Sequence, residues 1–219
     1  LPWGTLTGIR PTKIPMKFLK EGKTEEEIRT YMQKTYFASD EKIDLSIDIA
    51  ERELEILKKI DYENGYSLYI GIPFCPTTCL YCSFTSYPLV SWRQKVDSYL
   101  DALEKELDYV AVKFGKKHLN SIYIGGGTPT TLEPYQLDRL IRKIRCSFDL
   151  SHCLEFTVEA GRPDSITREK LETLKKWDIT RISINPQTMK DETLKIIGRR
   201  HTVAQTVESF QLARELGFD

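Results

Sequence analysis

Three cysteines lie close together in segment 71–84, whose sequence is GIPFCPTTCLYCSF. Cys75, Cys79 and Cys82 lie four and then three positions apart, and no fourth cysteine lies near them. Thiolates bind soft metals, and three thiolates on one loop are enough to hold a compact cluster. The spacing therefore predicts metal chemistry at this loop.

Three ligands are one short of the usual number. A structural zinc site takes four protein ligands, and none of the histidines, His118, His152 and His201, lies near the loop in sequence. An iron–sulfur cluster with one iron unligated by protein leaves a position that an exogenous molecule can chelate. A third alternative is a trio of structural cysteines. We predict the cluster, with the three cysteines as its ligands.

A run of glycines in the segment GGGTPT at 125–130 is a second place where chemistry is expected. Glycine lets the backbone approach a ligand closely and expose its N–H and C=O groups. The Gly-Lys-Ser/Thr of a phosphate-binding loop does not follow, and a tight turn without a ligand is the alternative. We expect four residues here to contact a cofactor: Gly125, Gly126, Gly127 and Thr128.

Three polar side chains, Glu159, Gln187 and Arg199, also come after predicted strands. The Glu159 carboxylate closes the third strand and is able to accept hydrogen bonds from ribose hydroxyls. Gln187 ends the fourth strand as a neutral polar group, and Arg199 is suited to pair with a carboxylate. The alternatives are an ion-paired strand-end carboxylate and a solvated basic turn. We predict that all three bind a cofactor.

The elements that position these residues are predicted from hydrophobic periodicity. Short β-rich or alternating apolar runs predict four strands: 67–72, 121–124, 154–159 and 179–184. Apolar residues at helical spacing predict a helix after each strand: about 96–114, 137–144, 171–174 and 202–217. Two more helices, about 24–37 and 43–60, are predicted after an irregular lead-in. Thr24 with Glu27, and Thr202 with Gln205, have the spacing of capping boxes.

The repeated strand–helix pattern predicts a parallel α/β sheet or barrel. Every residue selected above lies after a strand, and active sites of such folds form where the carboxyl ends of the strands meet. We expect an N-terminal helical segment at 1–62 and a domain of about four βα units at 63–219. Another strand is due after the last helix, so we expect the sheet to be incomplete at that edge.

Bulk composition excludes several function classes. Lysine and arginine, 32 together, balance 32 aspartates and glutamates, so no basic field favours nucleic acid. No apolar run approaches membrane-spanning length. The five cysteines are an odd number, and no signal peptide is recognisable, which indicates a reducing cytoplasm. Cys146 and Cys153, apart from the cluster, are predicted to be small buried side chains.

The spacing Cys-x₃-Cys-x₂-Cys after the first strand of repeated βα units resembles the radical S-adenosylmethionine superfamily. The resemblance implies that the three cysteines hold a [4Fe–4S] cluster, whose fourth iron binds the amino and carboxylate groups of S-adenosylmethionine. It implies that the glycine run contacts the methionine amino group. It also matches Tyr69 to a tyrosine beside the cluster, for which simple packing is the alternative. The fold implied is a partial (β/α) barrel of about six βα units, of which this chain holds four.

The motifs together resemble the oxygen-independent coproporphyrinogen III oxidase family more narrowly. They are the cysteine loop, GGGTPT, Ser-Ile-x-x-Gln at 183–187 and Gly-Arg-x-His-Thr at 198–202. The lead-in WGTLTGIRPTK at 3–13 and EAGRP at 159–163 resemble the coproporphyrinogen dehydrogenase branch of Gram-positive bacteria. The resemblance implies a 5′-deoxyadenosyl radical that abstracts hydrogen from a propionate of coproporphyrinogen III. The propionate then loses carbon dioxide to leave a vinyl group, with an external electron donor and acceptor.

Two residues depart from that family's pattern. Family oxidases usually carry histidine where this chain has Gly71, and some carry another cysteine where it has Phe84. Family members that resemble haem chaperones also lack the extra cysteine, and they bind haem instead of oxidising its precursor. A haem-trafficking protein that retains the cluster is therefore the second hypothesis.

Overall fold

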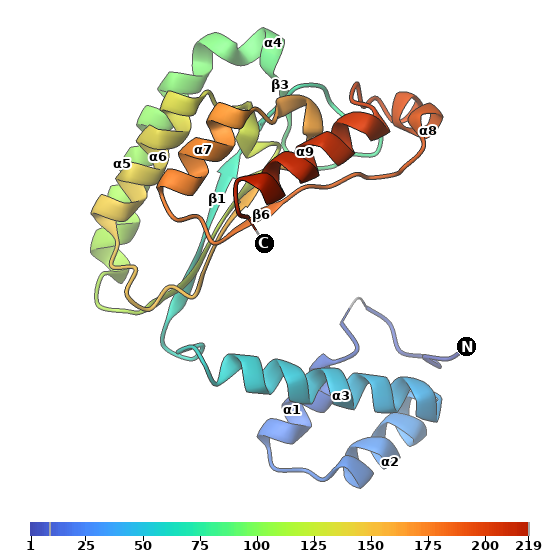
Figure 1. Cartoon of the computed structure of the whole chain (residues 1–219). Helices are drawn as coiled ribbons and strands as arrows, with labels where there is room; N and C mark the ends of the chain where they lie inside the picture. The colour runs from blue at the N-terminus through green and yellow to red at the C-terminus, as the bar shows by residue number, and fades with distance from the viewer. Residues whose placement is uncertain (9, 219) are drawn as a thin grey trace. The chain divides into compact units, whose positions relative to one another are not determined.

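The chain folds into two compact units, Leu1–Tyr62 and Glu63–Asp219. The structure, a computed structural model, describes residues 1–8 and 10–218. Each unit has a hydrophobic core of its own, and the two cores share no residue. Figure 1 shows the first unit as helical and the second as a sheet with helices.

The first unit consists of α1 (Lys13–Lys20), α2 (Glu25–Tyr36) and α3 (Asp40–Leu57). The predicted capping box at the start of α2 is confirmed, because the Glu27 N–H donates to Thr24 Oγ1 and the Thr24 N–H donates to Glu27 Oε2. The prediction of a wholly irregular lead-in is wrong, since α1 forms there. Pro15 lies in the first turn of α1, where its missing N–H has no intrahelical partner to lose.

The second unit contains a parallel sheet of four strands. They are β1 (Tyr66–Ile72), β4 (Leu119–Gly126), β5 (Glu155–Glu159) and β6 (Arg181–Ser183), in the spatial order β1-β4-β5-β6. Every pair in this sheet is parallel. The spatial order follows the chain order, as in a (β/α) barrel, whereas a doubly wound sheet reverses direction part-way. The predicted α/β fold is confirmed.

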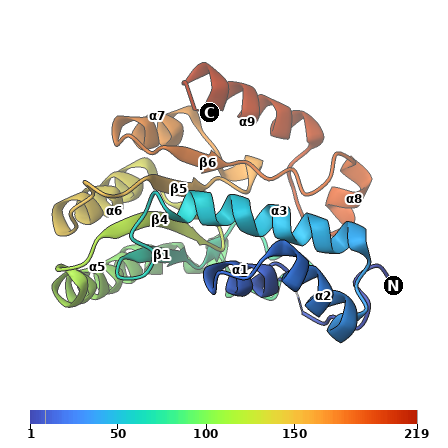
Figure 2. The ribbon, with the colours of Figure 1, turned by 90° about the horizontal axis from the view of Figure 1, so that it is seen from below.

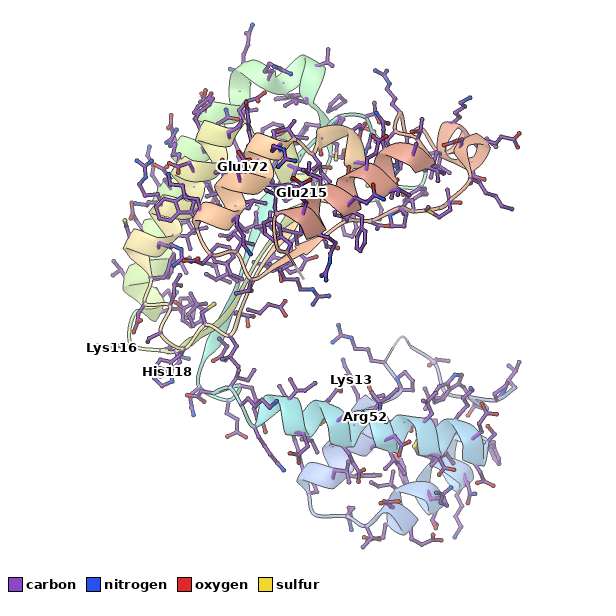
Figure 3. All side chains as sticks on the ribbon, viewed as in Figure 1. Lys13, Arg52, Lys116, His118, Glu172 and Glu215 are labelled. Carbon is purple, nitrogen blue, oxygen red and sulfur yellow. The ribbon has the colours of Figure 1, made fainter. Side chains whose placement is uncertain are left out.

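Four helices cover one face of this sheet (Figures 1 and 2). They are α5 (Val96–Phe114), α6 (Pro134–Ser147), α7 (Arg168–Lys176) and α9 (Val203–Glu215). Alternate strand residues such as Ile70, Ile124 and Val158 point into the core beneath these helices. On the outer surface, Arg168 of α7 pairs with Glu215 of α9 at 2.8 Å and with Glu172 at 4.0 Å (Figure 3).

The opposite face of the sheet is polar. Tyr69, Tyr123, Thr157 and Arg181 lie in register across the four strands. The rings of Tyr69 and Tyr123 stack with centroids 5.9 Å apart, and Arg181 lies 3.6 Å from the Glu155 carboxylate. Helices α5, α6, α7 and α9 cover the other face of the sheet, so we expect this polar face to line a site.

Several short elements lie in the loops at the carboxyl ends of the strands. They are β2 (Phe74–Cys75), β3 (Tyr87–Pro88), α4 (Leu89–Trp92), η1 (Arg93–Lys95), η2 (Pro129–Thr131), η3 (Pro163–Ser165) and α8 (Asp191–Ile196). None of these was predicted, because each is too short to show a hydrophobic period. Within the described parts of the chain, no helix combines the length and hydropathy needed to cross a bilayer.

Candidate cofactor site

A cavity of about 230 Å³ lies at the carboxyl ends of the four parallel strands. Loops that follow β1, β4, β5 and β6 all contribute to its wall. The wall includes nearly every residue that the sequence predicts for the site: Tyr69, Cys75, Cys79, Cys82, Gly126, Gly127, Thr128, Glu159, Gln187 and Arg199. The structure thus brings together side chains that are up to 130 positions apart, from Tyr69 to Arg199.

The three cysteines lie on one side of this cavity as free thiols. Cys75 is buried on β2 and its Sγ lies 3.3 Å from Thr128 Oγ1, while Cys79 and Cys82 are half-exposed. Among residues 1–8 and 10–218, no three His, Cys, Asp or Glu side chains converge on a single ion. One zinc ion needs all its ligand atoms within about 2.3 Å, whereas the thiolates of a four-iron cluster bind different irons. The three thiols on this cavity wall fit a cluster of that kind.

The glycine run fits tightly beneath the cysteine loop. Gly126 has a φ of +106°, and a Cβ there would lie 2.9 Å from the Ile72 nitrogen. A Cβ on Gly127 would lie 2.8 Å from the Phe74 carbonyl oxygen and 3.0 Å from Cys75 Sγ. Real Cβ atoms essentially never come within 3.0 Å of such atoms, so both positions require glycine.

Gly125 has a different reason to be glycine. A Cβ there would lie 2.7 Å from Tyr123 Cε1 and 3.2 Å from Glu159 Cδ. The lack of a side chain therefore makes room for the Tyr123–Glu159 pair, and the cavity wall begins at the next residue, Gly126. A contact between the Gly125 backbone and a cofactor stays a prediction.

Glu159 ends β5, as predicted, and its carboxylate is held by a neighbour from β4. The Tyr123 hydroxyl donates to Glu159 Oε1 at 2.5 Å. Burial, followed by this bond to a carboxylate, raises the pKa of Tyr123, so the phenol stays a donor. Tyr69, 61% exposed, stacks on Tyr123, and its own pKa is raised by burial and then by Glu159.

Arg199 and Gln187 reach the cavity from the loop after β6. Arg199 Nη1 donates to the Gly161 carbonyl oxygen at 3.0 Å. Its buried Nε meets no hydrogen-bond partner within the described chain, so one donor remains for an anionic group. The prediction that Gln187 ends a strand is wrong, because β6 stops at Ser183. Gln187 instead lies in a turn with φ +61°, where its N–H donates to Asn185 Oδ1 at 2.9 Å.

Sequence reasoning missed Arg162 as a site residue. Arg162 lines the cavity and is only 2% exposed, with its guanidinium paired to Asp164. Its only signal in the sequence was its place in the EAGRP motif. His201 is buried just before α9, as expected of a packing histidine. The prediction that Cys146 is buried is wrong, since this residue is exposed on α6.

These residues fit an iron–sulfur cluster with a small polar cofactor. Three free thiols share one cavity wall, and the glycine run brings backbone N–H and C=O groups directly beneath Cys75. Glu159 supplies hydrogen-bond acceptors, and Arg199 supplies a positive charge with one donor to spare. The donor set suits a ligand that carries hydroxyl, amino and carboxylate groups.

Comparison with known proteins agrees with this chemistry. Residues 69–219 match the radical SAM superfamily. The chain belongs to that superfamily. Its members use a [4Fe–4S] cluster and S-adenosylmethionine, so the cofactors that the resemblance implies are confirmed at the level of the family.

Three similar proteins carry coproporphyrinogen or heme in their names. The oxygen-independent coproporphyrinogen-III oxidase-like protein HemZ of Bacillus subtilis is 45% identical over 99% of this chain and 44% of its own length. The heme chaperone HemW of the same organism is 45% identical over 70% of this chain and 40% of its own length. The solved structure of coproporphyrinogen III oxidase (HemN) from Escherichia coli superposes with a TM-score of 0.64. It is 30% identical and covers 75% of this chain and 38% of the HemN chain.

The chain spans less than half the length of these relatives. The likeness to HemN supports the partial (β/α) barrel inferred from strand order. It leaves the activity and substrate of the whole protein to be proposed.

Proposed function

We propose that this protein is a radical SAM oxidoreductase that converts propionates of coproporphyrinogen III to vinyl groups by oxidative decarboxylation. The observation that carries the proposal is the single cavity in which the three cysteines meet Glu159 and Arg199. Its support is the similarity to HemZ, which extends over 99% of this chain. External electron donors and acceptors are part of the proposal, and neither nucleic acid nor a membrane is an expected partner.

The proposed site residues divide by role. Cys75, Cys79 and Cys82 hold the cluster. Four groups hold S-adenosylmethionine: the backbone of Gly125–Gly127 with Thr128 at its amino group, Glu159 at its ribose hydroxyls, Arg199 at its carboxylate, and Gln187 as a further polar contact. When bound, the cluster supplies the electron that cleaves the sulfonium to methionine and a 5′-deoxyadenosyl radical.

The protein's own groups orient the reaction and keep it dry. Tyr123 fixes the Glu159 carboxylate through their 2.5 Å hydrogen bond, so that carboxylate is preorganised for the ribose. Tyr69 lies over Tyr123 at the cavity wall, and we propose that its ring shields the reacting atoms from water. The pKa of Tyr69 is raised, so at neutral pH its hydroxyl keeps its proton.

A second candidate function is haem trafficking with the cluster retained. It is favoured by the similarity to HemW, which equals that to HemZ in identity but extends over 70% of this chain. Phe84, where some oxidases carry another cysteine, also agrees with it. The broader match to HemZ makes the oxidase the better-supported proposal.

Anaerobic reconstitution tests the shared part of both functions. We expect about four irons and four sulfides per chain, lost in Cys75→Ala and retained in Cys146→Ala. Cys146 is a matched control because it is a free, exposed thiol on α6, outside the cavity wall. Uptake of zinc without iron would refute the proposal.

Turnover separates the two functions. The reconstituted protein is given a reductant, S-adenosylmethionine, coproporphyrinogen III and an electron acceptor, and vinyl products are followed by chromatography. We expect decarboxylation coupled to formation of 5′-deoxyadenosine. Stoichiometric haem binding without decarboxylation would instead identify a trafficking protein.

A further inference from the structure

Arg162 is a buried cation in the loop that follows β5. Its side chain is 3% exposed and forms a bidentate pair with Asp164: Nε donates to Oδ1 at 3.0 Å and Nη2 donates to Oδ2 at 2.8 Å. A buried charge is costly unless it is paired and hydrogen-bonded. Asp164 meets that requirement by accepting from two N–H groups of Arg162, which leaves donors on both terminal nitrogens for other partners.

Those remaining donors reach the cysteine loop. Nη1 donates to the Thr77 carbonyl oxygen at 3.1 Å and to Cys79 Sγ at 3.8 Å, and Nη2 donates to Thr77 Oγ1 at 3.0 Å. The Thr77 hydroxyl in turn donates to the Gly198 carbonyl oxygen at 2.9 Å. Arg162 therefore links the loops that follow β1, β5 and β6 at the side of a cysteine.

The guanidinium stays charged in this position. An arginine guanidinium is protonated at any physiological pH, and here it is hydrogen-bonded to the Asp164 carboxylate and to Cys79 Sγ. The positive charge thus lies between one carboxylate and one cysteine sulfur. A thiolate that ligates iron carries negative charge, which this arrangement stabilises.

We propose that Arg162 is a positioning residue of the cluster site, which holds the cysteine loop through Thr77 and raises the reduction potential of the cluster through its bond to Cys79. The inference rests on the proposed function. Reduction adds negative charge to a cluster, and hydrogen bonds to its sulfurs are among the factors that set its potential. A fixed cation with a donor on Cys79 therefore favours the reduced state, from which S-adenosylmethionine is cleaved.

The test is a pair of substitutions with opposite expected effects. Arg162→Gln removes the cation, and Asp164→Asn removes the neighbouring negative charge while its amide oxygen still accepts from Arg162 Nε. The midpoint potential of the reconstituted cluster is measured without S-adenosylmethionine by a redox titration followed by electron paramagnetic resonance. We expect Arg162→Gln to lower the equilibrium constant for one-electron reduction about tenfold, which lowers the midpoint potential by about 59 mV. We expect Asp164→Asn to raise the midpoint potential.

Two further variants complete the design. Arg168→Gln removes an exposed arginine that pairs with Glu172 and Glu215 on the outer helices (Figure 3), and it should leave the potential unchanged. Arg162→Lys keeps the charge but places all its donors on one nitrogen. It should restore most of the potential lost in Arg162→Gln, while loosening the loop and slowing reconstitution.

The outcomes are decisive in each direction. General damage to the fold would shift both Arg162→Gln and Asp164→Asn in the same direction, and that result would overturn the inference. An unchanged potential in the cluster-bearing variants would also overturn it. If Arg162→Gln takes up no iron, a raised midpoint potential in Asp164→Asn and the midpoint potential of Arg162→Lys still decide the question. An unsubstituted protein that takes up no iron would refute the proposed function instead.

Discussion

Gly126 occupies a position that no other residue fits. Its φ of +106° is outside the range of L side chains, and an added Cβ would lie 2.9 Å from the backbone nitrogen of Ile72. We expect Gly126→Ala to lower the free energy of unfolding by about 1–3 kcal/mol. Chemical denaturation measures this change.

Gly161 is the matched control for that substitution. No heavy atom lies within 4 Å of the Cβ that alanine would add there, although Gly161 also lines the cavity. Gly161→Ala should therefore change stability by less than about 0.5 kcal/mol. Equal losses of stability in Gly126→Ala and Gly161→Ala would show that the backbone at Gly126 does not require glycine.

The carboxylate of Glu159 offers a second test at the level of one side chain. If it accepts hydrogen bonds from ribose hydroxyls, Glu159→Gln should weaken binding of S-adenosylmethionine about tenfold, because a charge-assisted hydrogen bond contributes about 1.5–3 kcal/mol. Calorimetry on the anaerobically reconstituted protein measures the dissociation constant. Tyr123→Phe keeps the carboxylate and removes only the phenol that orients it, so a smaller loss is expected. A larger loss in Tyr123→Phe would contradict the assignment.

Single residues of the site differ in how well the sequence predicts them. Cys75, Cys79 and Cys82 lie within eight positions, so their spacing alone predicts that they act together. Arg162 forms its bonds to Thr77 and Cys79 across more than 80 positions, and nothing local to Arg162 indicates those partners. Gly125 was predicted as a site residue, but the contacts that favour glycine there involve Tyr123 and Glu159 on two strands.

At the level of elements, the buried histidine before α9 makes stability depend on pH. Burial lowers the pKa of His201 below its ordinary value; Asp164 opposes that shift, whereas Arg199 and Arg162 add to it. The unfolded chain therefore binds a proton at a pH where folded His201 remains neutral. Stability supplied by this group is present above the unfolded pKa of about 6.5 and is lost as the pH falls toward the lower folded value.

Replacement of His201 should make the stability of the protein depend less on pH. We expect His201→Gln to lose less stability than the unsubstituted protein between about pH 6.5 and pH 5, as measured by denaturation at each pH. His118→Gln, at an exposed histidine in the turn before β4, is the control (Figure 3). A His201→Gln protein with an unchanged acid slope would show that His201 titrates alike in both states.

Elements with a strong period or cap were predictable, and short ones were not. The capping boxes at Thr24 and Thr202 both form as predicted, because each pair lies three residues apart on one turn. Helix α1 was missed because Pro15 suggested irregular structure, although proline is tolerated in a first turn. The predicted end of β6 was also wrong, because the chain leaves the sheet at Ser183 while its apolar character continues to Ile184.

At the level of the whole molecule, alternation along the strands explains both the core and the site. One face of the sheet lies beneath the helices, and the other carries hydroxyl, carboxylate and guanidinium groups in register. The same period of two that buries Ile70 and Ile124 therefore turns Tyr69 and Tyr123 toward the other face. The two faces of the sheet follow from the alternation in the sequence, whereas the contacts between loops depend on how the strands are staggered.

The division into two units leads to a last prediction. Unit Leu1–Tyr62 has its core around Ile28, Met32 and Ile43, whereas all the proposed cofactor contacts lie in the second unit. We propose that the two are separate domains. A protein that begins at residue 63 should then fold, as judged by circular dichroism, and take up the same iron per chain as the unshortened protein.

Core substitutions check that division without shortening the chain. Ile43→Ala and Ile124→Ala each remove a fully buried side chain and should cost about 2–5 kcal/mol in the unit that contains it. If the units are separate domains, Ile43→Ala leaves iron content unchanged at a temperature where Ile124→Ala lowers it. Loss of iron in Ile43→Ala, together with aggregation of the shortened protein, would show that the cluster-bearing unit needs the helical unit to fold.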